Sequence, residues 1–459
     1  MFLSRSMTMN FSRFKQILYF FLLGFALQVT FLYPTAWAIE VNKGAVTLLL
    51  AKDKNGNDLS TGTGFVVDPS GILVTNYHVL VDAARIDAVF PDGRSARVER
   101  VIKVDRVKDF AILKLQEDFY STLELGNSAG LEVFQFTQAL GYPTQRVISD
   151  KGNTSGRLFQ TYGFIVGVLP QANPDFSYIY TTADFDSGFS GGPLLDKDNR
   201  VVGIATIDGR SLNLALPIDE IKPFLNEKKD ISLATFVEQD LQFPEADYFR
   251  GNFYLYEKGE PEEAIESFNK VIAQKPDWVP AYNDLATAYR DLGDTDKAIA
   301  NYKKVLELNP RFAEALTNLG SFYFRAGKIA EAKDLFDKAV KQFPNFVQAL
   351  SNLGATLNKL GEPEKALSYL QRAVKVDPEF EMAYFNLGNS YFDLKKWESS
   401  ENSFNRAVAL GVDFLSLHWK LYEIYKKQGA SEKVKQQLSI ILQIDPENEK
   451  ALKEMGDDR

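Results

Sequence analysis

The stretch Asp186-Ser187-Gly188-Phe189-Ser190-Gly191-Gly192-Pro193-Leu194 places one serine among glycines, in a half of the chain rich in short β-branched runs. Glycine tolerates tight turns, so we expect Ser190 on a turn where backbone N–H groups point inward. Such a turn suits a nucleophile, because donors that stabilise an oxyanion lie beside the hydroxyl. The stretch therefore predicts a nucleophilic serine, which needs activating partners from elsewhere in the chain.

Two upstream motifs carry the residue types that activate a serine. The run Ile72-Leu73-Val74-Thr75-Asn76-Tyr77-His78-Val79-Leu80 delivers a histidine at a strand end. The run Lys108-Asp109-Phe110-Ala111-Ile112-Leu113-Lys114 places an acid before an apolar strand. Asp105 is a near alternative, but it lies outside the D-x-A-x-L-K pattern. A histidine base held by a carboxylate is the usual activator of a serine.

The region around these motifs reads as an all-β domain over residues 39–229. Short β-branched runs alternate with turn signals such as Asn55-Gly56 and Asp208-Gly209, a pattern typical of a sandwich or barrel. Residues Ile218–Asn226 read as a short amphipathic helix that closes the domain. Residues 230–244 are expected to form a linker crossed by few contacts.

The motifs TNYHVL, DFAILKL and GFSGGPL, in this order, resemble the blocks of trypsin-fold serine proteases, most closely the HtrA/Deg branch of exported bacterial proteases. The resemblance runs from about Ala45 to Phe224. It implies an all-β trypsin-like double β-barrel and endopeptidase activity on protein or peptide substrates. It also implies a role in protein quality control, with no cofactor and no metal.

The resemblance carries over residue by residue. Ser190 matches the nucleophile, His78 the general base, and Asp109 the acid that orients the imidazole. The backbone N–H groups of Gly188 and Ser190 match the oxyanion hole. The stretch Leu212–Leu216 matches the strand that pairs with the substrate backbone. The substrate-binding residues expected from it are Leu212, Asn213, Leu214 and Ala215.

Asp184 lies six residues before Ser190, where this fold forms the floor of the S1 pocket. A carboxylate there is costly without a cation, so it predicts a preference for lysine or arginine at P1. The alternative is that Asp184 turns outward or is bound by loop N–H groups, in a stretch that Asp186 shows to be acidic.

Phe189 departs from the family pattern, because HtrA proteases usually have asparagine before the serine and digestive trypsins have aspartate. In digestive trypsins that aspartate forms a salt bridge with a newly cut N-terminus. A new N-terminus at Ile39 would find no aspartate at position 189, so activation by such a salt bridge is not expected. A bulky side chain beside the oxyanion loop leaves a second hypothesis open. In that hypothesis the chain is a repeat scaffold or adaptor that carries an inactive protease-like domain.

From Glu245 to Asn448 the chain repeats with a period of 34 residues. The recurring residues are Gly259, Gly293, Gly327, Gly361, then Ala264, Ala298, Ala332, Ala366, then Pro276, Pro310, Pro344 and Pro378. The pattern resembles the tetratricopeptide repeat (TPR) family and predicts an all-α solenoid of six repeats over residues 245–448. Residues 449–459 are expected to be a C-terminal tail. The repeats stand where HtrA proteases usually have a PDZ domain.

The repeat array is expected to recruit a substrate or a protein partner in its groove. Aromatic and amide side chains fall at groove-facing offsets, although they could instead pack between neighbouring repeats. These residues are Phe249, Phe253, Tyr256, Phe324, Phe385, Asn389 and Phe392. His418 falls in the sixth repeat at a packing offset, so we expect a structural role for it.

The N-terminal segment has the pattern of a signal peptide over residues 1–38. Arg5, Arg13 and Lys15 precede the apolar run Ile17–Leu27, and Ala36-Trp37-Ala38 follows as a small-x-small cleavage site. We expect export to the periplasm or another extracytoplasmic compartment, with no stable membrane span after cleavage. An uncleaved membrane anchor is the alternative.

Composition excludes several function classes. The chain has 459 residues and a formal net charge of −9, which disfavours a nucleic-acid partner. It has no cysteine, which excludes disulfides, cysteine nucleophiles and thiolate metal sites. With only two histidines, a multi-histidine metal centre is also disfavoured. The expected architecture is therefore multidomain, with a β-barrel protease followed by the solenoid.

Overall fold

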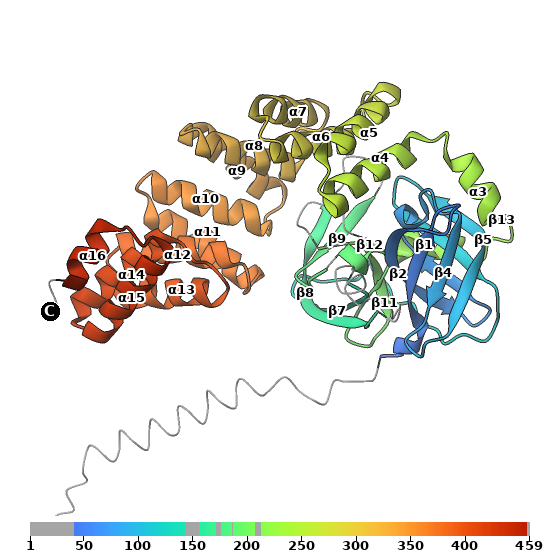
Figure 1. Ribbon diagram of the computed structural model, residues 1–459, viewed down its shortest axis with the longest axis horizontal. Helices are drawn as coiled ribbons and strands as arrows, with labels where there is room; N and C mark the ends of the chain where they lie inside the picture. Colours follow the sequence, from blue (N-terminus) through green and yellow to red (C-terminus); the bar gives the residue numbers. More distant parts are fainter. Residues whose placement is uncertain (1–40, 144–155, 171–175, 186, 207–212, 457–459) are drawn as a thin grey trace, which may run out of the picture.

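The computed structural model describes five ranges of the chain, in which two β-barrels precede an array of helices (Figure 1). These ranges are residues 41–143, 156–170, 176–185, 187–206 and 213–456. The predicted signal segment and the candidate residues Asp186 and Leu212 lie outside them. Within these ranges, no helix has both the length and the apolar character to cross a bilayer.

The first barrel is an antiparallel sheet closed by the pairing of β5 with β6, in the order β5-β4-β1-β2-β3-β6. Its strands are β1 (Val46–Lys52), β2 (Asp58–Asp68), β3 (Ile72–Thr75), β4 (Arg85–Val89), β5 (Ser95–Asp105) and β6 (Phe110–Leu115). Two 3-10 helices, η1 (Lys43–Ala45) and η2 (Tyr77–Leu80), flank these strands. Successive side chains of β1, β3 and β6 point to opposite faces, and both faces are largely buried, in two different apolar clusters.

The second barrel closes in the order β10-β11-β12-β9-β8-β7. Its strands are β7 (Phe136–Gly141), β8 (Phe159–Pro170), β9 (Ser177–Thr181), β10 (Pro193–Leu195), β11 (Val201–Thr206) and β12 (Leu214–Pro217). The 3-10 helix η3 (Ser187–Phe189) precedes β10. The predicted trypsin-like double barrel is thereby confirmed.

The helix predicted over residues 218–226 is instead a pair of 3-10 helices, η4 (Ile218–Glu220) and η5 (Lys222–Phe224). Pro223 lies at the start of η5. Proline lacks the N–H that an α-helix interior requires, so a single continuous helix cannot pass through this position.

The interval expected to be an open linker, residues 230–244, differs from that expectation. It contains β13 (Ile231–Ser232), which pairs with β5, and helix α3 (Leu233–Asp240). Leu233 and Phe236 are buried against the core of the first barrel. Burying two large apolar side chains stabilises this packing by a few kcal/mol, about 1.5–3 kcal/mol for each side chain. The segment is therefore part of the barrel's surface layer.

The helices after α3 pack in antiparallel pairs, as TPR motifs do. They are α4 (Pro244–Asn252), the π-helical η6 (Phe253–Lys258), α5 (Pro261–Gln274), α6 (Val279–Asp291), α7 (Thr295–Leu308), α8 (Ala313–Arg325), α9 (Ile329–Gln342), α10 (Val347–Lys359), α11 (Pro363–Val376), α12 (Glu381–Asp393), α13 (Trp397–Ala409), α14 (Leu415–Gln428), α15 (Ser431–Ile444) and α16 (Glu449–Gly456). The recurring alanines are fully buried, and the recurring glycines have φ between 68° and 78°, the left-handed turn that glycine accepts.

The predicted C-terminal tail contains α16, so this part of the expectation is corrected. Ala451 of α16 packs against Tyr422, Leu438 and Ile441 of the last repeat. The helix covers an apolar face that would otherwise be open at the end of a stack, which is how terminal repeats are usually protected.

The array contacts both barrels. The second barrel is contacted by two residues that follow α9. The Phe343 ring lies 5.7 Å from the Tyr180 ring, and the Asn345 side-chain amide donates to the backbone oxygen of Val166 at 2.9 Å. Gly167 faces the same Phe343 ring, where a Cβ would come within 2.8 Å. Helix α4 lies over the first barrel (Figure 1). The repeats are therefore packed onto the β-domain at two places.

Candidate active site

His78 and Asp109 face each other across the end of β3 and the start of β6. The imidazole Nδ1 lies 2.7 Å from Asp109 Oδ2, and the backbone N–H of His78 donates to Oδ1 at 2.9 Å. The Asn76 side chain donates to the backbone oxygen of Asp109 at 2.6 Å. These three bonds hold the carboxylate and the turn η2 in one arrangement.

A further donor to Asp109 comes from the second barrel. The Thr206 hydroxyl, at the end of β11, donates to Asp109 Oδ2 at 3.2 Å. Thr206 is buried, and so is Asp109, with only 3% of its surface exposed. Sequence reasoning missed Thr206, for which the only signal was a hydroxyl at the end of an apolar strand. The carboxylate is thus bound from both barrels.

Three influences act on the pKa of His78. Burial lowers it, but the negative charge and hydrogen bond of Asp109 raise it, and the charge of Glu257 raises it further. The net result is a pKa above the ordinary histidine value. The site therefore favours an imidazolium, which is the form that a histidine takes after it accepts a proton.

The backbone around Ser190 is tied to β2. The backbone oxygen of Ser190 accepts from Thr63 N–H at 2.8 Å, and the Thr63 hydroxyl donates to the backbone oxygen of Gly188 at 2.6 Å. Thr63 in turn accepts, through its backbone oxygen, a hydrogen bond from the Thr75 hydroxyl at 2.7 Å. One residue of the first barrel therefore connects the serine turn to the end of β3, next to His78.

Gly191 shows how closely the serine turn approaches the histidine strand. Its φ is 84°, and a Cβ here would lie 2.2 Å from the Thr63 oxygen and 2.9 Å from Asn76 N. Only glycine accepts both that backbone conformation and that proximity. Gly188, the other expected oxyanion donor, lies within η3, and Ser190 follows it directly.

The Phe189 ring points into the core of the second barrel. It is 1% exposed and stacks on Phe185, with centroids 6.2 Å apart and planes at 12°. Gly141 makes room for it, because a Cβ there would lie 2.4 Å from Phe189 Cγ. The bulky residue is thus accommodated in the core.

Asp184 lies on the loop after β9, and Asn213, directly before β12, contacts the same loop. Asp184 is exposed, and its backbone oxygen accepts from the Thr161 hydroxyl at 2.7 Å. Asn213 accepts from Thr181 N–H at 3.1 Å and, through its side chain, from Phe185 N–H at 3.1 Å. An exposed Asp184 does not fit the expected floor of a closed pocket, and Asn213 supports the loop.

Leu214 and Ala215 differ from their expected role. They lie on β12, which pairs with β11 on one side and with β9 on the other, and their side chains are fully buried. A strand paired on both sides has no backbone edge left for a substrate. Leu212, the remaining residue expected to bind substrate, lies in the segment 207–212, outside the described ranges.

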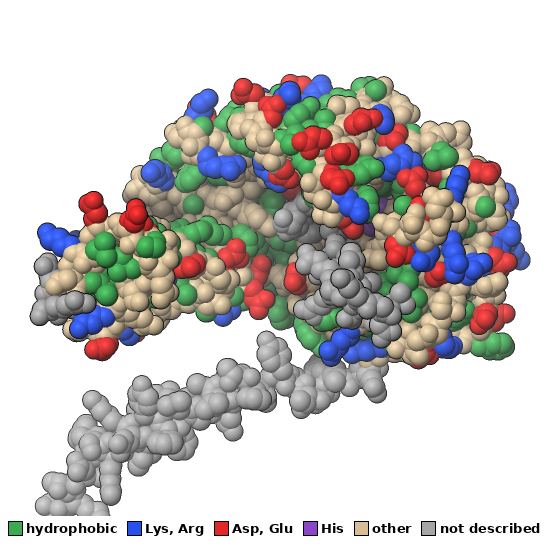
Figure 2. Space-filling view, in the orientation of Figure 1, with side chains coloured by type: hydrophobic (Ala, Val, Ile, Leu, Met, Phe, Trp, Pro, Cys, Tyr) green, Lys and Arg blue, Asp and Glu red, His purple; other side chains and the backbone are tan. Residues whose placement is uncertain are grey.

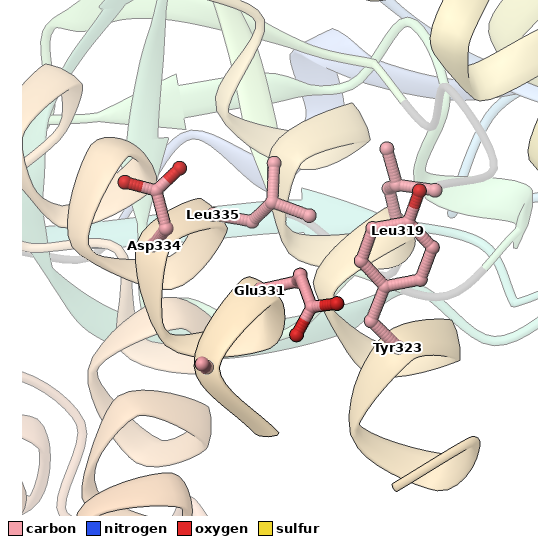
Figure 3. Close-up of a pocket in the computed structure, with 6 residues that line it drawn as sticks. Leu319, Tyr323, Glu331, Asp334 and Leu335 are labelled. Atoms are coloured by element: carbon pink, nitrogen blue, oxygen red, sulfur yellow. The ribbon is translucent and has the colours of Figure 1, made fainter. Parts of the chain in front are cut away.

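A hollow of about 480 Å³ lies in the repeat array, away from His78 and Asp109 (Figure 3). It is lined from α8 and α9 by Leu319, Tyr323, Ala330, Glu331, Asp334 and Leu335. Its walls combine apolar side chains with two carboxylates. In the part of the chain that the structure describes, no group of three histidine, aspartate or glutamate side chains is placed to hold a metal ion.

The aromatics expected in the groove are in part packing residues. Phe385 contacts Phe404 and Phe414, with centroids 6.2 Å and 5.2 Å apart. Phe392 lies edge-on to Trp397, 5.5 Å away. For these two, packing against neighbouring helices of the array is the better interpretation of the pattern.

The class of protein follows from family models that match the two halves. Residues 62–204 match the trypsin-like peptidase domain, and residues 247–277, 283–346, 347–380 and 383–410 match tetratricopeptide repeats. The chain therefore combines a trypsin-like peptidase domain with TPR repeats, as the sequence motifs indicated.

Curated relatives of the peptidase part are HtrA serine proteases. The chain is 36% identical over 179 residues to "Serine protease HTRA2, mitochondrial" of Bos taurus, covering 38% of this chain and 37% of that protein. It is 34% identical over 171 residues to "Serine protease HTRA4" of Mus musculus, covering 37% and 34%. It is 33% identical over 174 residues to "Serine protease HTRA1A" of Danio rerio, covering 38% and 35%. The chain thus spans little more than a third of these relatives' lengths.

Proposed function

We propose that this chain is a serine endopeptidase in which Ser190, His78 and Asp109 act as a triad. The observation that carries the proposal is the 2.7 Å contact between His78 Nδ1 and the buried, multiply bonded Asp109 carboxylate. That contact leaves Nε2 as the nitrogen for proton transfer. The similarity to HtrA serine proteases supports the same assignment.

In the proposed reaction, His78 Nε2 takes the proton of the Ser190 hydroxyl as its oxygen attacks the scissile carbonyl. The imidazolium then protonates the leaving amine, and the peptide C–N bond breaks to leave an acyl-serine. Water, deprotonated by the same imidazole, hydrolyses the ester and regenerates Ser190. Asp109 remains ionised throughout and stabilises the imidazolium.

The oxyanion donors proposed for this reaction are the N–H groups of Gly188 and Ser190. Gly188 lies within η3, Ser187–Phe189, and Ser190 follows that turn directly. In the proposed reaction both N–H groups donate to the oxyanion of the tetrahedral intermediate and stabilise its developing charge.

For the array, the proposal is recruitment of an extended protein segment. The hollow between α8 and α9 offers the Leu319 and Leu335 side chains beside the carboxylates of Glu331 and Asp334. This combination suits a segment with apolar and basic side chains. Glu331→Gln should then raise KM for casein while leaving the hydrolysis of a short peptide unchanged.

The proposed setting is extracytoplasmic, on the strength of the signal-like segment alone. Cleavage after Ala38 should leave Ile39 as the first residue of the exported chain. N-terminal sequencing of the protein from a periplasmic fraction would give Ile39, whereas Met1 on a membrane-bound form would support the anchor.

The deciding experiment is covalent labelling with a fluorophosphonate probe, which reacts only with an activated serine. The wild type should be labelled on Ser190, and both Ser190→Ala and His78→Ala should lose labelling and casein cleavage by several orders of magnitude. Circular dichroism would show that the variants remain folded. A folded wild type that resists labelling would favour the alternative, a repeat scaffold with an inactive protease-like domain.

A further inference from the structure

The first repeat contacts the turn that carries His78. The ring of Phe249, in α4, stacks on the imidazole with centroids 5.8 Å apart and planes at 28°. The same ring lies edge-on to Tyr77, 5.4 Å away at 76°. Phe249 belongs to the apolar surroundings of both the first barrel and the first repeat. It therefore joins the repeat array to the candidate catalytic base.

Hydrogen bonds and ion pairs fasten α4 and the preceding helix α3 to either side of the turn. Arg250 donates to Asp82 through two bonds, of 2.6 Å and 3.0 Å, and Asp82 follows η2 by two residues. Asp240, at the end of α3, accepts from the Tyr77 hydroxyl at 2.6 Å and from Arg106 at 2.6 Å. A bidentate arginine–carboxylate pair has a defined geometry. The position of Phe249 over the imidazole is thus held by neighbours on both sides.

The first repeat also departs from the others in its backbone. Its first helix changes to the π-helical η6 at Phe253–Lys258, whereas the corresponding helices α6, α8, α10, α12 and α14 are α-helical throughout. Single π-helical turns occur often at functional positions. Glu257, whose charge acts on His78, lies in η6. The irregular turn therefore belongs to the same neighbourhood as the imidazole.

We propose that Phe249 is a positioning residue for His78, so that the first repeat is part of the protease active site. This inference rests on the triad proposed above. Asp109 fixes one edge of the imidazole, and the Phe249 ring limits its tilt. An aromatic face also attracts a cation. The contact therefore stabilises the imidazolium of the acylation step more than the neutral ring of the resting site, which accelerates the reaction.

The test compares Phe249→Leu, which keeps an apolar side chain but removes the ring face, with Phe249→Tyr, which keeps the ring. The full-length protein is treated with a fluorophosphonate probe, and labelling of Ser190 is resolved into a maximum rate and a half-saturating concentration. Phe249→Leu should lower the maximum rate about 3- to 30-fold, with little change in half-saturation. Phe249→Tyr should restore the rate to within about twofold of the wild type.

Phe385→Leu is the matched control, because Phe385 is an aromatic residue of the same array that packs against Phe404, with the ring planes tilted at 48°. It should label at the wild-type rate. If Phe249→Leu melts below the assay temperature, Arg250→Gln replaces it. That change keeps the ring but loosens its helix, and it should also slow labelling.

The outcomes separate the two proposals. A wild type that is not labelled refutes the triad itself. An active wild type with Phe249→Leu labelling at the same maximum rate overturns the positioning role and leaves the triad standing. Faster labelling by Phe249→Leu also overturns it, because the ring would then act as a cover over His78.

Discussion

At the scale of single residues, Asp109 is held in a backbone conformation that most residues avoid. Its φ is 58°, in the left-handed region, which costs a non-glycine residue about 1–3 kcal/mol. Donors from His78, from Asn76 and from Thr206 offset that cost through the side chain and the backbone. Strain that is maintained by several neighbours is typical of sites where orientation matters.

Thr206 gives a direct test of that support. Thr206→Val keeps the shape of the side chain but leaves Asp109 Oδ2 with one donor fewer, and the loss of a buried hydrogen bond costs about 1–3 kcal/mol. We expect kcat on a short peptide to fall about tenfold. Thr206→Ser, which retains the hydroxyl, should keep most of the activity. Equal rates for the valine and wild-type proteins would contradict the role assigned to this donor.

The pH profile should report on His78 and Glu257. His78 acts as a base only when neutral, and its raised pKa moves the acid limb of kcat/KM above the ordinary histidine value of about 6.5. Glu257→Gln removes a negative charge that raises this pKa, so the limb should move to lower pH. The control Glu262→Gln, an exposed residue at the start of α5, should leave the limb in place. A limb that does not move in Glu257→Gln would show that its charge does not reach the imidazole.

At the scale of elements, the match between Phe189 and Gly141 connects η3 to β7. Gly141→Ala would place a methyl group 2.4 Å from Phe189 Cγ, so we expect a loss of about 1–3 kcal/mol in the free energy of unfolding. Gly130→Ala, where a Cβ meets nothing within 4 Å, is the control. Urea denaturation measures both. Recovery of stability in Gly141→Ala with Phe189→Leu would support the packing explanation, and no recovery would count against it.

At the scale of the whole molecule, the sequence predicts the folded elements better than it predicts the contacts between distant segments. Each of the three motifs lies within a short stretch, and the 34-residue period recurs along residues 245–448, so the barrels, the repeats and the candidate triad could be predicted from residue order. The contacts of Phe249 with His78, and of Thr206 with Asp109, join residues far apart in the chain. No periodic pattern marks such pairs, because they depend on how whole elements pack.

The same reason explains the linker that was expected over residues 230–244. The polar residues around Asp230 and Pro244 resemble a linker between two domains. Leu233 and Phe236 are nevertheless buried against the core of the first barrel. Four apolar residues in the eight of Leu233–Asp240 do not by themselves distinguish a helix packed on a neighbour from a solvated connector. Asp184 was similarly ambiguous, because its count from Ser190 does not decide whether a loop turns inward or outward.

Truncation tests whether the β-domain is independent of the array. A chain that ends at Ser232 lacks α3, so Tyr77 and Arg106 lose the Asp240 carboxylate, and the buried Leu233 and Phe236 are removed. We expect it to be less stable than the full chain and to label slowly with a fluorophosphonate. A chain that ends at Gln274 keeps α3, α4, η6 and α5, and hence the Phe249 contact and the Arg250–Asp82 pair. Although most of the array is missing from this chain, it should recover most of the labelling rate, because it keeps the contacts to the turn that carries His78. Full activity in the shorter chain would instead show that the peptidase domain is complete without the repeats.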